Sequence, residues 1–147
     1  MKNEFMFLAI KEAEKAASMG EIPVGAVIVL DNIVIAKAHN LIETTKDPTA
    51  HAEILAIKKA CSYLESRRLT DASIYVTLEP CPMCAGAIIL SRLKNVYFGA
   101  YDPGMGAGGG NIDLFRENLS SPKINVYGGL CEEECKNLLT DFFKNNR

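Results

Sequence analysis

Residues 73–99 read SIYVTLEPCPMCAGAIILSRLKNVYFG, and this stretch decides the fold class. The run 73–78 is rich in β-branched and aromatic residues and predicts a strand, as does the shorter run 96–99. The segment 84–93 between them predicts a helix that follows Pro82. Two strands joined through a helix lie parallel with a right-handed crossover, so the stretch indicates an α/β sheet.

Residues on both sides of this unit extend the same pattern. Apolar residues recur at steps of three and four near the N-terminus, and two β-branched runs separated by Asp31-Asn32 predict a hairpin. The expected elements outside 73–99 are a helix over 3–18, strands over 24–30 and 33–39, a helix from about 49 to 61, a strand over 124–127, and a last helix carrying Cys135, Leu138, Leu139 and Phe142. The economical fold is a three-layer α/β/α arrangement with a mixed sheet of about five strands.

Length and composition limit the class of protein. A chain of 147 residues is expected to form a single domain over 1–147. The formal net charge of −2 and the pI near 5.7 do not indicate nucleic-acid binding, although a small basic patch remains open. No run approaches the roughly eighteen apolar residues of a membrane span, and Lys11 and Glu12 interrupt the first apolar run. We therefore expect a cytoplasmic protein without a signal peptide.

The chain has five cysteines, which are Cys61, Cys81, Cys84, Cys131 and Cys135. An odd number of cysteines in a chain without an export signal argues against a disulfide framework. Metal binding or burial must then account for them. We expect Cys61, Cys131 and Cys135 to be packing residues, because free cysteine behaves mostly as a small hydrophobic side chain.

Two short motifs, HAE at 51–53 and PCPMC at 80–84, carry the chemistry. Imidazole and thiolate are ligands that zinc prefers, and Cys81 and Cys84 stand three apart at the start of a helix, so both sulfurs can face one point. The positive end of that helix favours thiolate. With His51 there are three ligands, and a fourth position left to water is typical of catalytic zinc. Glu53 is the nearby carboxylate that can transfer protons.

Two other interpretations remain open for these motifs. A CxxC by itself is common in redox pairs and in ordinary helices, and an isolated HxE has no specific meaning. A structural zinc module that binds a partner without catalysis predicts a fourth protein ligand at the metal. We interpret His39 as a core or pocket-wall residue rather than as that fourth ligand.

The combined motifs resemble the signature of the cytidine deaminase-like zinc deaminases. The resemblance extends to EIPVGAVIV (21–29), DPTAHAEILA (47–56) and RLTDASIYVTLEPCPMCAGAI (68–88), which are similar to the bacterial tRNA-specific adenosine deaminases. It covers essentially the whole chain. It implies hydrolytic deamination of adenosine to inosine at the wobble position of tRNA. The alternative on the same fold is a deaminase of a free base or nucleoside such as guanine or cytosine.

The resemblance also implies roles for the matching positions. His51, Cys81 and Cys84 would hold one Zn²⁺ per subunit, and Glu53 would transfer protons while C6 of adenine is attacked and ammonia leaves. Substrate would be bound by Asn40, by the backbone N–H of Ala52, by Pro23 and Val24 in the pocket wall, and by Asp102 beside the nucleotide. The expected partners are a tRNA anticodon stem-loop and a second copy of the chain in a homodimer.

The glycine-rich segment 99–111 fits the dinucleotide-binding pattern G-x-G-x-x-G at 104–109, but it does not immediately follow a strand or open a helix. We expect it to be a loop at the mouth of the site. Near the C-terminus, Phe142 and Phe143 could stack on exposed RNA bases. At least one of them is expected to lie in the core.

Overall fold

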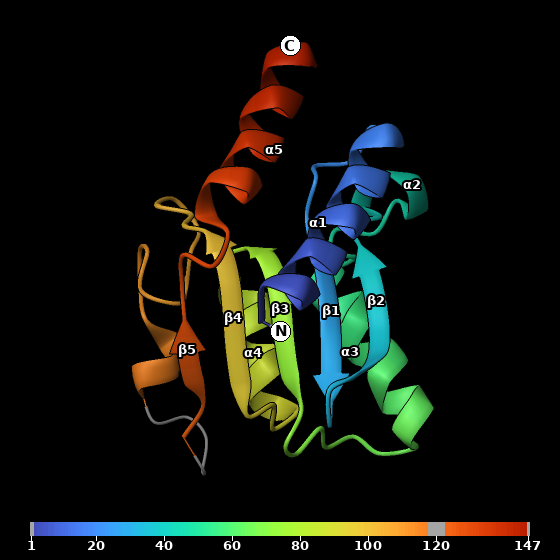
Figure 1. The fold of residues 1–147 in the computed structure, drawn as a ribbon, viewed down its shortest axis with the longest axis vertical. Helices are drawn as coiled ribbons and strands as arrows, with labels where there is room; N and C mark the ends of the chain where they lie inside the picture. The colour runs from blue at the N-terminus through green and yellow to red at the C-terminus, as the bar shows by residue number, and fades with distance from the viewer. Residues whose placement is uncertain (1, 118–122, 147) are drawn as a thin grey trace.

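The computed structural model describes residues 2–117 and 123–146, which form a five-stranded sheet between two layers of helices (Figure 1). The elements are α1 (Lys2–Ser18), β1 (Gly25–Leu30), β2 (Ile33–His39), α2 (Ile42–Thr45), α3 (Ala52–Leu64), β3 (Ser73–Leu78), α4 (Pro82–Leu90), β4 (Asn95–Ala100), the 3₁₀ helix η1 (Leu114–Glu117), β5 (Asn125–Tyr127) and α5 (Glu132–Asn145). The predicted three-layer α/β/α fold with a mixed sheet is confirmed. None of the helices in the described ranges has the length and apolar character that crossing a membrane requires.

The strand order is β2-β1-β3-β4-β5. β1 runs antiparallel to both of its neighbours, whereas β3, β4 and β5 are parallel. The parallel pairing of β3 and β4 through α4 is the crossover that the central stretch predicts. At the turn between β1 and β2, Asp31 and Asn32 have φ values of 52° and 63°. Positive φ at both central residues matches the twist of a hairpin, and short polar side chains tolerate it.

Alternation along β1 divides the core between the two faces of the sheet. Ala26 and Ile28 face the cluster that α3 and α4 cover, whereas Val27 and Val29 face α1 and α5. In Figure 1, α1 lies in front of the sheet, α3 and α4 lie behind it, and α5 rises from the upper end of β4. The sheet is therefore buried on both faces, which explains the nearly continuous apolar runs of its strands.

Two expectations need correction, and one short helix is additional. The helix predicted from about residue 49 begins at Ala52 and ends at Leu64, because Asp47 accepts a hydrogen bond from the backbone N–H of Thr49 and holds that residue in a turn. The short helix α2 was not predicted. Neither Phe142 nor Phe143 lies in the core, since α5 extends past the sheet (Figure 1) and the two rings pack edge to face on each other.

The topology brings three segments to one edge of the sheet. Because β1 is antiparallel to β3, the start of β1 and the end of β2 lie beside the end of β3, where Gly25 donates a hydrogen bond to Oγ1 of Thr77. The residues before Gly25, after His39 and after Leu78 consequently meet. Ligands of open α/β sheets bind at this carboxyl edge of the parallel strands.

Candidate active site

Two helices begin at this edge, and each is preceded by one of the motif residues. His51 is the N-cap of α3 and Cys81 the N-cap of α4, and both have extended backbone conformations. Pro82 occupies the first turn of α4, where its missing N–H costs no helical hydrogen bond. Cys84 lies in the same turn and is fully buried. Two helix N-termini therefore direct their positive ends at one point, where anionic groups are stabilised.

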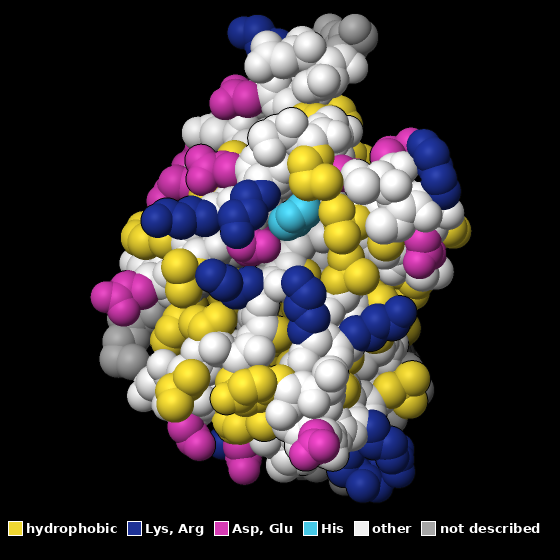
Figure 2. All heavy atoms as spheres, turned by 90° about the vertical axis from the view of Figure 1, so that its right-hand side faces the viewer, with side chains coloured by type: hydrophobic (Ala, Val, Ile, Leu, Met, Phe, Trp, Pro, Cys, Tyr) yellow, Lys and Arg dark blue, Asp and Glu magenta, His cyan; other side chains and the backbone are white. Residues whose placement is uncertain are grey.

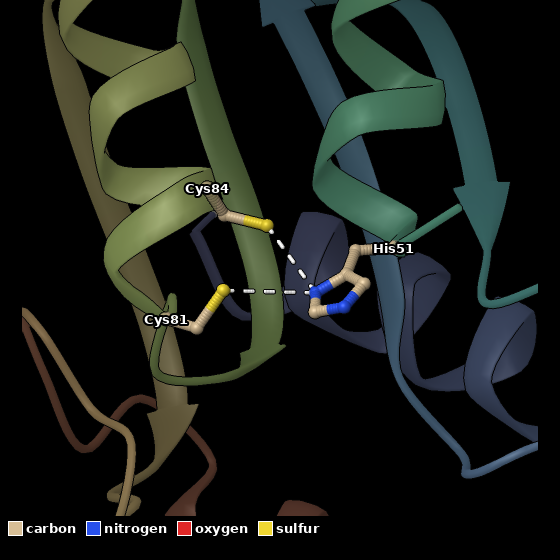
Figure 3. Close-up of side chains that lie close together, drawn as sticks. All are labelled: His51, Cys81 and Cys84. Atoms are coloured by element: carbon tan, nitrogen blue, oxygen red, sulfur yellow. Dashed lines mark hydrogen bonds between the residues drawn. The ribbon is translucent and has the colours of Figure 1, made fainter. Parts of the chain in front are cut away.

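His51, Cys81 and Cys84 point toward one another (Figure 3). The Nδ1 atom of His51 lies 3.7 Å from Sγ of Cys81 and 3.5 Å from Sγ of Cys84, and the three ligand atoms lie within 4.8 Å of one another. Tetrahedral zinc with typical Zn–S and Zn–N bonds separates such N and S atoms by about 3.6 Å. A single ring N–H cannot serve two sulfurs fully, but one cation can. The observed spacing and donor types therefore fit a zinc ion.

The two thiols of this group have pKa values that are shifted in opposite directions. The hydrogen bond from Cys84, helped by His51, lowers the pKa of Cys81 to about 4 despite its partial burial. The same hydrogen bond and burial raise the pKa of the Cys84 thiol. The contact with Cys81 raises the pKa of His51. A thiolate is thus favoured at Cys81, and a thiolate is the form in which cysteine binds metals.

Glu53 lies in the first turn of α3, and only 3% of it is exposed to solvent. Its Oε1 atom has no hydrogen-bond partner among the described residues. Burial raises the pKa of Glu53 to about 7, although the neighbouring His51 opposes the shift. A buried carboxyl group with an unsatisfied oxygen needs a specific explanation, and a proton-transfer role beside a cation provides one.

A cavity of about 230 Å³ opens beside Glu53. It is lined by Ile22, Val24, Asn40, Ile42, His51, Glu53, Leu78, Glu79, Cys81, Asp102 and Met105. Of the predicted substrate-binding residues, Val24, Asn40 and Asp102 are in this lining, whereas Ala52 and Pro23 are buried next to lining residues in the chain. A larger hollow of about 440 Å³ lies at the opposite edge, beside Leu93 and Lys94, away from the His–Cys–Cys group.

Asn40 connects two sides of this cavity. Its Oδ1 accepts a hydrogen bond of 2.8 Å from the backbone N–H of Ala52, and its Nδ2 donates to the carbonyl of Ile22 at 3.2 Å. The amide thereby ties the start of α3 to the segment before β1. Because Nδ2 carries two protons, the bond to Ile22 leaves a second donor for another group.

The glycine-rich segment forms another side of the cavity through Asp102 and Met105. Oδ1 of Asp102 accepts hydrogen bonds from the backbone N–H groups of Gly104 and Met105, each at 3.1 Å. Sequence reasoning missed Ile22, Ile42, Leu78, Glu79 and Met105 as lining residues. The position of Glu79 directly before the PCPMC motif was the one available signal.

The remaining candidates lie apart from this group. All five cysteines are free, and Cys135 is buried against the α1 face of the sheet, as expected of a packing residue. Cys61 and Cys131 are half-buried beside the two core clusters. The His39 ring is half-buried on β2, where its Nδ1 lies 3.1 Å from the carbonyl of Asn40.

A three-layer fold with a His–Cys–Cys group and a buried carboxylate at the carboxyl edge of its sheet defines the cytidine deaminase-like class of enzymes. The family model of the MafB19-like deaminases matches residues 1–147, and the chain belongs to this family.

Particular proteins and solved structures are similar to this chain over much of its length. The tRNA-specific adenosine deaminase of Bacillus subtilis (strain 168) is 50% identical over 143 residues, which cover 97% of this chain and 89% of that protein. A solved structure from studies of A-to-I editing by tRNA:A34 deaminases superposes with a TM-score of 0.89 at 45% identity, covering 92% of this chain and 99% of that one. A guanine deaminase from Bacillus subtilis superposes with a TM-score of 0.65 at 44% identity, covering 67% of this chain and 63% of that one.

Proposed function

We propose that the chain deaminates adenosine to inosine at the wobble position of tRNA by hydrolysis. The observation that carries the proposal is the His51–Cys81–Cys84 group beside the buried Glu53 carboxyl, in a chain that matches tRNA-specific adenosine deaminases over nearly its full length. A free-base deaminase is the weaker alternative, because the relatives that are 50% and 44% identical over nearly the full chain are tRNA-specific adenosine deaminases. The guanine deaminase structure that is 44% identical covers only 67% of the chain.

His51, Cys81 and Cys84 would hold one zinc ion. Their N–S distances of 3.5 and 3.7 Å suit tetrahedral coordination, and the described residues add no fourth protein ligand to the group. An open position of this kind supports a catalytic rather than a structural site. When bound, zinc would act as a Lewis acid that lowers the pKa of water to about 7.

Glu53 would carry the protons of the reaction. A carboxyl whose pKa lies at about 7 can accept a proton from the attacking water and return it at neutral pH. It would deliver one proton to the adenine ring and then enable the exocyclic amino group at C6 to leave as ammonia. Adenosine and water thereby become inosine and ammonia, with no other reactant.

The cavity residues would hold the base against this carboxyl. The remaining donor of Asn40 and the backbone at Ala52 supply polar contacts, whereas Pro23 and Val24 supply apolar wall. Asp102 would face the flanking nucleotide from the glycine-rich loop. Figure 2 shows a band of Lys and Arg side chains across the face that carries β2 and α3, where a phosphate backbone can be attracted despite the net charge of −2.

We further propose that residues 1–147 form one domain of a cytoplasmic homodimer. The two core clusters pack on the two faces of a single sheet, which supports one domain. The proposed tRNA substrate supports the cytoplasmic location. α4 contains no charged residue, yet Met83 is 37% and Leu90 78% exposed. A helix that is apolar on all sides is normally covered, and a second copy of the chain would cover it.

The test uses an anticodon stem-loop with adenosine at the wobble position, and separately guanine, cytosine and adenosine. Inosine in the stem-loop, measured by nucleoside mass spectrometry, together with released ammonia supports the proposal. A stem-loop with guanosine at that position is the matched control. Ammonia from a free base without inosine in RNA would establish the alternative, and ammonia from no substrate would favour a structural zinc module.

A further inference from the structure

The glycine-rich loop is wrapped around one buried carboxylate. Glu79 is only 2% exposed, and it accepts three hydrogen bonds from backbone N–H groups of this loop. Its Oε1 accepts from Asp102 at 2.9 Å, and its Oε2 accepts from Gly108 at 2.9 Å and Gly110 at 2.6 Å. Bonds to a carboxylate are stronger than bonds between neutral groups, so this side chain adds strongly to the hydrogen bonds that the loop makes within itself.

The close approach of the loop backbone to Glu79 explains why the loop has glycine at two positions. A Cβ atom on Gly106 or on Gly110 would overlap the carboxylate of Glu79, and on Gly106 it would also overlap the carbonyl of Asp102. The loop therefore needs residues without side chains to bring its N–H groups to the carboxylate. This requirement accounts for Gly106, within the sequence that resembles a dinucleotide-binding motif, and for Gly110 directly after it.

Glu79 also connects the segment that carries Cys81 with the loop that forms one wall of the cavity. It follows the last residue of β3 and stands two positions before Cys81, while the loop that it holds presents Asp102 and Met105 to the cavity. A further hydrogen bond of 2.8 Å runs from the N–H of Ala107 to the carbonyl of Pro80. The segment that carries a ligand of the His–Cys–Cys group is thus fastened to one wall of the cavity.

We propose that Glu79 is a positioning residue that fixes the 102–110 loop as a wall of the substrate cavity, and so controls substrate binding rather than proton transfer. The proposal rests on the proposed function. Glu79 has no role as a ligand or proton carrier in it, because both of its oxygens are occupied by the loop's N–H groups.

The test is Glu79→Gln in the metal-loaded protein, with stem-loop deamination measured across substrate concentrations. An amide keeps the size of the carboxyl but turns one acceptor into a donor that faces loop N–H groups. Losing one bond to a charged group corresponds to roughly 10-fold or more in an equilibrium. We expect KM to rise by about 10-fold, with kcat changed less than about threefold and zinc content unchanged.

Glu12→Gln is the matched control. Glu12 is also a buried carboxylate, but it pairs with Lys15 on α1, on the other face of the sheet. This variant should keep the wild-type KM. A wild-type KM in Glu79→Gln, or a loss of kcat with no change in KM, would overturn the proposal.

Hydrogen exchange separates this proposal from the proposed function. In Glu79→Gln the amides of Asp102, Gly108 and Gly110 should exchange at least about 10-fold faster, while those of α3 stay protected. If the wild type does not deaminate RNA but the loop amides behave in this way, the proposed function fails and the anchoring stands. Unchanged exchange would refute the proposal that Glu79 fixes the loop.

A second variant applies if Glu79→Gln does not fold. Gly106→Ala perturbs the same contact from the loop side and should also raise KM. An unchanged KM would contradict the proposal.

Discussion

Replacing Glu21 with Gln should destabilise the protein strongly at neutral pH and weakly at acidic pH. Glu21 is 1% exposed and fastens the segment before β1 to α2. Its Oε1 accepts from the N–H of Glu43 at 3.1 Å, and its Oε2 accepts from the N–H and the hydroxyl of Thr44, each at 2.6 Å. Ile22 and Ile42, on the two fastened segments, line the cavity. This side chain therefore supports a part of the cavity wall that is separate in sequence from the loop held by Glu79.

The size of the effect follows from these three bonds. Each hydrogen bond to a charged group contributes about 1.5–3 kcal/mol, and Gln can keep only the bonds to a single oxygen. We expect a loss of about 2–4 kcal/mol in the free energy of unfolding at pH 7. For a chain of this length the loss lowers the melting temperature by roughly 4–16 °C. Glu12→Gln, which removes only the ion pair with the largely exposed Lys15, should cost less than about 1 kcal/mol.

The stabilisation by Glu21 depends on pH, and the direction follows from the shift in its pKa. Burial alone would raise the pKa of Glu21, but the bonds from Thr44 and Glu43 outweigh it and lower the pKa below the usual 4.5. The carboxylate therefore stabilises the fold above pH 4.5, and this contribution is lost as the pH falls through the lower value in the folded state. Urea unfolding of metal-free wild type and Glu21→Gln should show a difference that shrinks below that pH. A difference that is absent at pH 7 or constant with pH would refute the reasoning.

Two further predictions concern the metal and the remaining cysteines. Glu53→Gln should retain the metal and lose at least about 100-fold in kcat, whereas His51→Ala should lose both; activity in Glu53→Gln, measured as ammonia release, would contradict the assignment. Cys135→Ser should cost about 1–3 kcal/mol in urea unfolding, because it buries a hydroxyl, while the half-buried Cys131→Ser costs less. Metal content should be normal in both serine variants, and a drop in either would place that cysteine at the metal.

The parts of the fold that depend on nearby residues were predictable from the sequence. The strands of the central unit, the hairpin at Asp31-Asn32 and the helix at Pro82 each have a signature within a few neighbouring residues, namely β-branched runs, a polar turn pair and a proline. The start of α3 was placed too early, because the turn at Asp47 ends only when His51 has been reached. That delay leaves His51 as an extended N-cap residue facing α4.

Contacts between distant positions account for what the sequence did not reveal. Glu79 binds loop residues 23 to 31 positions away, and Glu21 binds α2 at 22 and 23 positions. Neither pattern has a local signature. The burial expected for Phe142 or Phe143 failed for a related reason, since periodicity identifies the apolar side of α5 but not where the sheet beneath it ends.

The candidate active site thus consists of two parts with different structural origins. The His–Cys–Cys group and Glu53 are placed by the first turns of α3 and α4, whose starts are set by local sequence. The cavity walls are placed by two buried carboxylates that hold separate loops. Substitutions in those loops can change the shape of the cavity without moving the group that we propose performs the chemistry. A guanine deaminase with the same fold is consistent with this division, because a different base then requires different walls rather than a different reaction.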